Sequence, residues 1–204
     1  MKERGKFVVL EGGVGCGKST QEKLLREGPP YWEFYREPGG TPFGEKIRDA
    51  VQGLHGYDVD RIASLFAYSS SRANLIRGVV IPRLEDGANV LLDRFWYSTF
   101  AYQGTEGVSK LLIWGVSLVA TRGLKPNMVL HYELSPEVGK TRKEGRHDAD
   151  RYDLKGVDFH QKVRKNYLLL SKLYPGIWKT IDASQPIEKV FEDSMNALKA
   201  QGIV

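Results

Sequence analysis

Cysteine is almost missing from this chain of 204 residues: Cys16 is the only one, so no internal disulfide bond can form. The sequence also lacks a run of about 18 apolar residues, the length that a membrane-spanning helix needs. Its first six residues are mostly charged and lead directly into an apolar run at Phe7, unlike an export signal. These absences predict a cytoplasmic protein without a membrane anchor.

Long runs of one charge are missing as well. The chain has 30 basic and 25 acidic residues, a formal net charge of +5, which alone would suggest nucleic acid as a partner. The lysines and arginines do not form a run along the sequence. Several arginines instead lie beside motif residues: Arg36, Arg94, Arg142, Arg146 and Arg151. We therefore expect contacts with a few phosphates and no binding to nucleic acid.

Strand-like and helical stretches alternate along the whole chain. The apolar, β-prone runs are 6–10, 32–35, 89–92, 128–132 and 177–181. Such alternation is typical of an α/β fold in which helices cover a parallel sheet, here of five strands. At this length we expect one domain over residues 1–204.

A glycine-rich loop follows the first predicted strand. Residues 12–19 read Gly-Gly-Val-Gly-Cys-Gly-Lys-Ser, and a helix-forming stretch, 21–26, comes directly after. Gly12, Gly15 and Gly17 allow backbone amides to surround a phosphate where a Cβ would obstruct the turn. Lys18 adds a cation for the outer phosphates, and the Ser19 hydroxyl can coordinate Mg²⁺. The loop predicts a nucleoside polyphosphate as ligand.

Polar clusters follow two further predicted strands, where parallel sheets bind ligands. Residues 36–41 read Arg-Glu-Pro-Gly-Gly-Thr, and residues 93–95 read Asp-Arg-Phe. Asp93 would lie near the Mg²⁺, while the fork of donors on Arg94 suits bidentate contact with a phosphate. An internal ion pair between neighbours is the alternative interpretation of such residues.

A strongly charged stretch, residues 142–153, contains almost no apolar side chains and cannot be core. Mixed charge of this kind is most often a solvated or mobile loop. In a protein with a phosphate loop it also suggests a mobile lid, approximately 142–154, that brings positive charge to the group being transferred. Both interpretations can hold together.

Taken in order, these motifs resemble those of thymidylate kinases, which phosphorylate dTMP to dTDP with ATP. The similarity covers nearly the full length and includes Glu11-Gly12, 36–41, 93–95, Ser98, 101–104 and 150–152. It implies a three-layer P-loop NTPase fold with a mobile lid. Thymidylate kinases are nucleoside monophosphate kinases, so the resemblance also implies dTMP and ATP as substrates.

On the donor side, the resemblance implies that residues of the loop bind ATP and Mg²⁺. The implied ATP contacts are Gly12, Gly13, Val14, Gly15, Cys16, Gly17, Lys18, Ser19, Thr20 and Arg142, the last stacked on adenine. Ser19 and Asp93 would hold the metal, with Glu37 helping to order its waters.

On the acceptor side, the resemblance implies that Arg48 and Arg94 bind the phosphate of dTMP. Tyr68 would stack on thymine, and Arg72, about one helical turn later, would reach a carbonyl of the base. The other implied contacts of the acceptor pocket are Glu37, Ser98, Thr99 and Tyr102, with Tyr102 near the sugar, where it would exclude a 2′-hydroxyl. Alternatively, Phe66 and Tyr68 are simply half-buried helix residues.

Catalytic arginines in this family lie in the phosphate loop or in the lid. The loop here has Gly15 and no arginine, so the chain resembles the lid-arginine type, with Arg146 and Arg151 neutralising charge on the transferring group. With them, the implied catalytic residues are Lys18, Arg94 and Glu37. Four positions depart from common family choices: Val14, usually acidic, Thr99, its neighbour Phe100, and Asp153, usually glutamate.

Other functions fit parts of the pattern. The chain could phosphorylate another deoxynucleoside monophosphate or a deoxynucleoside, or it could be a nucleotide-binding switch, although a guanine-specific Asn-Lys-x-Asp motif is missing. The family is usually homodimeric, and the apolar stretch 111–120, which contains Trp114, offers a candidate surface.

Overall fold

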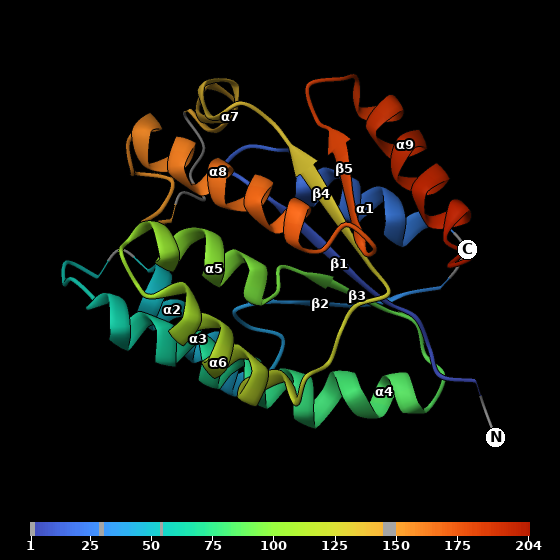
Figure 1. Cartoon of the computed structure of the whole chain (residues 1–204), viewed down its shortest axis with the longest axis horizontal. Coiled ribbons are helices and arrows are strands. Elements are labelled where there is room, and N and C mark those ends of the chain that lie inside the picture. Colours follow the sequence, from blue (N-terminus) through green and yellow to red (C-terminus); the bar gives the residue numbers. More distant parts are fainter. Residues whose placement is uncertain (1–2, 29–30, 54, 145–149) are drawn as a thin grey trace.

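In the described part of the chain, five parallel strands form one sheet in the order β2-β3-β1-β4-β5 (Figure 1). The computed structural model describes residues 3–28, 31–53, 55–144 and 150–204. The strands are β1 (Phe7–Gly12), β2 (Glu33–Arg36), β3 (Val90–Asp93), β4 (Met128–Glu133) and β5 (Trp178–Asp182). The helices are α1 (Lys18–Glu27), α2 (Pro42–Gln52), α3 (Arg61–Leu75), η1 (Ile76–Val80), α4 (Ile81–Glu85), α5 (Trp96–Thr105), α6 (Lys110–Thr121), α7 (Pro136–Lys143), α8 (Val157–Leu173) and α9 (Ile187–Ala200).

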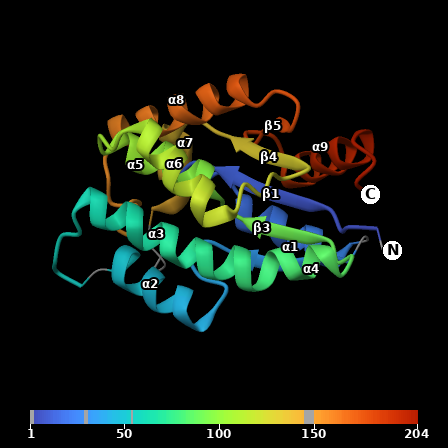
Figure 2. The same cartoon turned by 60° about the horizontal axis from the view of Figure 1, so that its bottom comes forward.

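Two hydrophobic cores lie on opposite faces of the sheet, because successive side chains of a strand point to opposite sides. In β1, Phe7 and Val9 belong to the larger core, which α3, α5 and α8 complete. Val8 and Leu10 belong to the smaller core, which α1 and α9 cover. The layers are therefore helix, sheet and helix (Figure 2), and the predicted three-layer α/β fold is confirmed.

Strand register brings the polar residues of the motifs to one edge of the sheet. Leu10 pairs with Asp93 across β1 and β3, and Asp93 pairs with Arg36 across β3 and β2. On the other side of β1, Gly12 pairs with Tyr132 of β4. Since all strands are parallel, the loops that follow them meet at this same edge, where such sheets bind ligands.

All five predicted strands exist, with ends that differ by one or two residues. The first strand runs on through Glu11 and Gly12 beyond its predicted end at residue 10, and both residues are part of the β1–β4 pairing. The predicted stretches 21–26, 65–72 and 111–120 lie in α1, α3 and α6. Over the residues that the structure describes, no helix has the length and apolar character needed to cross a membrane.

Candidate active site

The phosphate loop joins β1 to α1 and has the backbone conformation that its glycines allow. Gly15 and Gly17 have φ angles of 60° and 82°, in the left-handed region that side chains disfavour. At Gly12 a Cβ would lie 2.5 Å from the Cys16 sulfur and 2.9 Å from the Tyr132 carbonyl oxygen. Gly17 directly precedes α1, so the loop ends at a helix N-terminus, which favours anions.

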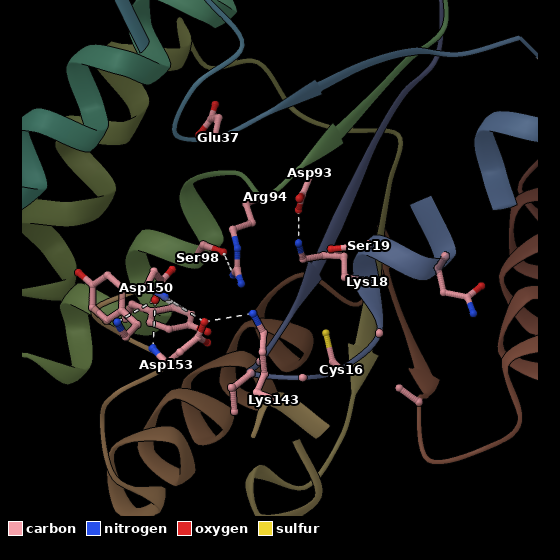
Figure 3. A pocket seen from close by; sticks show the side chains of 18 of the residues that line it. Cys16, Lys18, Ser19, Glu37, Asp93, Arg94, Ser98, Lys143, Asp150 and Asp153 are labelled. Atoms are coloured by element: carbon pink, nitrogen blue, oxygen red, sulfur yellow. Dashed lines mark hydrogen bonds and ion pairs between the residues drawn. The ribbon is translucent and has the colours of Figure 1, made fainter. Parts of the chain in front are cut away.

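Lys18 and Asp93 form an ion pair directly beside the loop (Figure 3). Both side chains are largely buried. Burial by itself would raise the pKa of Asp93, but the charges of Lys18, Arg94 and Arg48 outweigh it and hold that pKa below its usual value. Asp93 is therefore a charged carboxylate at the point where the phosphates of a nucleotide would lie.

Arg94 follows β3 in a left-handed backbone conformation, with φ of 69°. Its guanidinium donates hydrogen bonds to Ser98 Oγ at 2.9 Å and to the Gly12 carbonyl at 3.3 Å, so it reaches across to the phosphate loop. Its Cζ lies 5.4 Å from the ring centre of Tyr102. These contacts place a fixed cation between the loop and α5.

Glu11 holds the residues around Arg94 in place. Its carboxylate is fully buried and accepts hydrogen bonds from the Phe95 amide at 2.9 Å, from Ser98 Oγ at 2.6 Å and from the Tyr167 hydroxyl at 2.9 Å. Burial raises the pKa of Glu11, and Arg94 is the main opposing influence. The Glu11 carboxylate thus bonds to the first turn of α5 and to Tyr167 of α8. Its charge also attracts the Arg94 guanidinium.

Arg72 lies deeper, almost completely buried, in a row with Glu37 and Thr99. Its Nε donates to Glu37 Oε2 at 2.6 Å and its Nη2 donates to Thr99 Oγ1 at 3.0 Å. Burial raises the pKa of Glu37 to about 7, although Arg72 opposes the shift. The remaining nitrogen, Nη1 of Arg72, has no partner among the described residues. A buried donor of this kind needs an acceptor, which a ligand carbonyl can supply.

One cavity of about 850 Å³ is lined by the phosphate loop, the Lys18–Asp93 pair, Arg94 and the Arg72 row. Of the predicted site residues, its walls include Gly13, Val14, Gly15, Cys16, Gly17, Lys18, Ser19, Thr20, Glu37, Arg48, Tyr68, Arg72, Asp93, Arg94, Ser98, Thr99, Tyr102 and Arg142. Arg48 is held by a 3.1 Å hydrogen bond to the Pro38 carbonyl. The phosphate loop lies at one end of this cavity and the Arg72 row at another, so two ligands can meet inside it.

The two predicted lid arginines are placed differently. Arg146 lies outside the described residues. Arg151 does not line the cavity; its Nη2 donates to Ser64 Oγ at 2.8 Å and to the Tyr152 hydroxyl at 2.6 Å, and it lies 4.0 Å from Glu106. In this conformation Arg151 connects the end of the predicted lid segment to α3 and to Glu106, the residue after α5.

Sequence comparison identifies the family. The family model described as thymidylate kinase matches residues 10–194. A curated thymidylate kinase from a Thermoanaerobacter species is 37% identical, covering 96% of this chain and 98% of its own length. Those from Clostridium novyi and Deinococcus radiodurans are 36% and 34% identical, covering 96% and 98% of this chain and 99% and 98% of their own lengths. The chain belongs to the thymidylate kinase family.

Within this thymidylate kinase fold, sequence reasoning missed several residues that build the site. Glu11 and Tyr167 lie 156 positions apart and meet only because β1 and α8 pack together. Gln103 donates to the Tyr152 hydroxyl at 2.6 Å, inside the same cavity. The available signal for Glu11 was a charged residue at the end of an apolar strand. Burying a carboxylate is costly unless hydrogen bonds or a cation compensate for it. Nothing in the sequence pointed to Tyr167.

Of the four departures from family choices, Phe100 is buried in the larger core, and the other three have definite surroundings. Val14 is 6% exposed, and its Cγ1 would lie 3.3 Å from a Cβ at Gly139. Thr99 accepts the hydrogen bond from Arg72, and Asp153 accepts one from Lys143 at 3.1 Å. Thr99 and Asp153 are therefore integrated in polar networks of this thymidylate kinase, whereas Val14 contributes an apolar wall.

Proposed function

We propose that this protein transfers the γ-phosphoryl group of ATP to dTMP, as its family membership implies. An oxygen of the dTMP phosphate forms the new bond to the γ-phosphorus, and the bond from that phosphorus to the bridging oxygen breaks, leaving its electron pair on ADP. The observation that carries the proposal is the single cavity with the phosphate loop at one end and the buried arginine row at another. Phosphoryl transfer requires chiefly positioning and neutralisation of charge, which these residues supply.

At the donor end, the loop amides and Lys18 would bind the phosphates of ATP. The Lys18 ammonium is already held in place by Asp93 and is largely buried, so little rearrangement is needed. Arg142 lines the same end and donates to the Ala183 carbonyl at 3.1 Å, which fixes the plane of its guanidinium. A fixed guanidinium plane is suited to stacking on adenine.

At the acceptor end, the base would lie between Tyr68 and the Arg72 row. The unpartnered Nη1 of Arg72 would donate to a carbonyl of thymine, while Thr99 and Glu37 hold the other nitrogens. Because both neighbours already accept hydrogen bonds from Arg72, its orientation is fixed before the base arrives. Arg94 and Arg48 would bind the phosphate, and Tyr102 would lie at the sugar.

The residues present fit a Mg²⁺ ion beside the loop. No group of three His, Cys, Asp or Glu side chains in the described ranges could hold a metal by itself. Mg²⁺ in phosphoryl-transfer sites needs only one or two protein ligands, with phosphates and water completing the octahedron. Ser19 and the ionised Asp93 offer that number, and the ion would neutralise charge on the phosphates. Glu37, held by Arg72, would act farther from it.

The remaining features of the proposal concern the lid, the assembly and the compartment. Residues 142–154 would close over the nucleotides as a lid within one domain. Arg146 and Arg151 would supply charge to the transferring group, and Arg151 would first have to leave Ser64 and Glu106. We further propose a homodimer in the cytoplasm, with the exposed apolar residues of α6 as the contact surface.

The test is a panel of acceptors assayed with ATP: dTMP, dUMP, dGMP, dCMP and thymidine. We expect dTMP to give the highest kcat/KM. Higher activity with another monophosphate or with thymidine would favour the corresponding kinase instead, and ATP hydrolysis without any transfer would favour a switch.

Arg94→Ala is the matched variant for this assay. It removes charged hydrogen bonds worth about 1.5 to 3 kcal/mol each and should lower kcat/KM for dTMP at least tenfold, by the usual conversion of about 1.4 kcal/mol per factor of ten. Near-normal turnover would contradict the role given to Arg94.

A further inference from the structure

The segment after β5 forms one wall of the cavity near the phosphate loop. Ala183, Gln185 and Ile187 line the cavity together with Arg142 and Thr20. Ala183 is held to the sheet by a 2.9 Å hydrogen bond from its amide to the Glu133 carbonyl. Because Arg142 is the residue proposed to stack on the donor base, the segment 183–187, which lines the cavity beside Arg142, would form an adjacent wall of the base pocket.

Side chains from elsewhere in the chain hold this segment at both of its ends. Arg142 donates to the Ala183 carbonyl at 3.1 Å, and Gln21 Nε2 donates to the Ile187 carbonyl at 3.1 Å. Between them, Ser184 and Gln185 bond to Asp182 at the end of β5, and Gln185 also bonds to Asp193 of α9. The position of the wall relative to the phosphate loop therefore depends on Arg142 and Gln21.

Gln21 is an unusual choice for a purely structural position. It is 2% exposed, and its Oε1 has no partner among the described residues, so burying this amide is only partly compensated. An apolar side chain of similar size would avoid that penalty. Gln21 also lines the cavity, but its Oε1 is buried and its Nε2 donates to the Ile187 carbonyl, so the amide acts on the wall.

Gln21 lies on the same turn of α1 as two residues of the phosphate end of the cavity. Ser19 and Thr20, which precede it on the same helix, line the phosphate end of the cavity. One rigid helical turn thus carries both the residues that hold the phosphates and the amide that holds the base wall. The distance between the phosphate pocket and the base pocket is set by that turn.

We propose that Gln21 is a positioning residue for the base of the donor nucleotide. By fixing the Ile187 carbonyl, it keeps the segment 183–187 at the spacing from the phosphate loop that a purine triphosphate requires. This inference rests on the proposed role of ATP as donor. It assigns to Gln21 an effect on base binding that is separate from phosphate binding.

The experiment uses Gln21→Met, which retains length and bulk but lacks the amide. We expect KM for ATP to rise about three- to tenfold, the range for one neutral hydrogen bond, with kcat and KM for dTMP unchanged. Inorganic tripolyphosphate, a competitor that has phosphates and no base, should inhibit the variant and the wild type equally. Glu27→Gln, at the exposed last residue of α1, is the matched control and should behave as wild type.

Two results would overturn the proposal: an unchanged KM for ATP, whether or not kcat falls, or an equal loss of affinity for tripolyphosphate. If Gln21→Met does not fold, as judged by thermal unfolding, Gln21→Glu carries the test. Its carboxylate repels the Ile187 carbonyl and should raise KM for ATP further, again without affecting tripolyphosphate. Failure of the proposed function would appear separately, as wild-type protein that does not use ATP.

Discussion

At the scale of single residues, Glu37 combines two properties that rarely coexist. It is almost completely buried and yet holds the charged group that would recognise the base. Burial raises its pKa to about 7, with Arg72 opposing, so its charge changes near neutral pH. Protonation removes the negative partner of Arg72 while leaving a hydrogen-bonding group in place.

This pKa leads to opposite pH trends in activity and in stability. We expect kcat/KM for dTMP to fall as the pH drops below about 7, because neutral Glu37 orients Arg72 less firmly. Stability runs the other way: the folded pKa lies above the ordinary value of 4.5, so the stabilising contribution is complete below 4.5 and is lost as the pH rises through 7. Activity profiles and chemical denaturation at several pH values measure both trends.

Glu37→Gln is the control for both trends. It should remove the acid limb near pH 7 from the activity profile and flatten the difference in unfolding free energy between pH 4.5 and 7. An unaltered acid limb in this variant would assign the ionisation to another group. The buried His131 cannot supply it, because burial and then Arg164 lower its pKa to about 3.

At the scale of elements, α7 and the phosphate loop are in backbone contact. A Cβ on Gly15 would lie 2.0 Å from the Gly139 carbonyl oxygen, and a Cβ on Gly139 would lie 2.1 Å from the Val14 carbonyl oxygen. Neither position can accept a side chain unless backbone moves. The helix that carries Arg142 therefore has its position relative to the loop fixed by two glycines.

Gly139→Ala tests this contact. We expect a loss of about 1 to 3 kcal/mol in unfolding free energy from overpacking, together with a higher KM for ATP as α7 and the loop separate. Gly78→Ala is the control: Gly78 is exposed in η1, a Cβ there meets nothing within 4 Å, and helical alanine should stabilise by about 0.5 to 1 kcal/mol. If Gly139→Ala gave the same change in unfolding free energy and the same KM for ATP as this control, the contact between α7 and the loop would contribute nothing to either.

The elements were largely predictable from the sequence, and the contacts between them were not. Apolar runs bounded by glycine and proline located every strand of the sheet, and parallel topology brought the groups after β2 and β3 to one edge. The link from Glu11 to Tyr167 depends on how α8 packs on β1, which no local pattern encodes. For the same reason the sequence could not show that Glu37 binds Arg72, or that Arg151 binds Ser64.

At the scale of the whole molecule, the largest exposed apolar side chains of α6 form a stripe. Leu111, Trp114 and Leu118 are 76%, 47% and 46% exposed and recur at the spacing of one helical face. Val119 beside them is 70% exposed, and Phe66 on the neighbouring α3 is 54% exposed. Contiguous apolar surface of this kind is typical of an interface between subunits.

The homodimer that we propose should therefore depend on Trp114. Trp114→Glu places a charge in the stripe, and burying it twice across a symmetric interface would cost several kcal/mol, enough to dissociate the pair at micromolar concentration. We expect light scattering to give a dimer mass for the wild type and a monomer mass for this variant. Tyr31→Glu, at a side chain 95% exposed on the connection between α1 and β2, should remain dimeric. A wild type that is monomeric at all concentrations, or a Trp114→Glu variant that stays dimeric, would remove α6 as the interface.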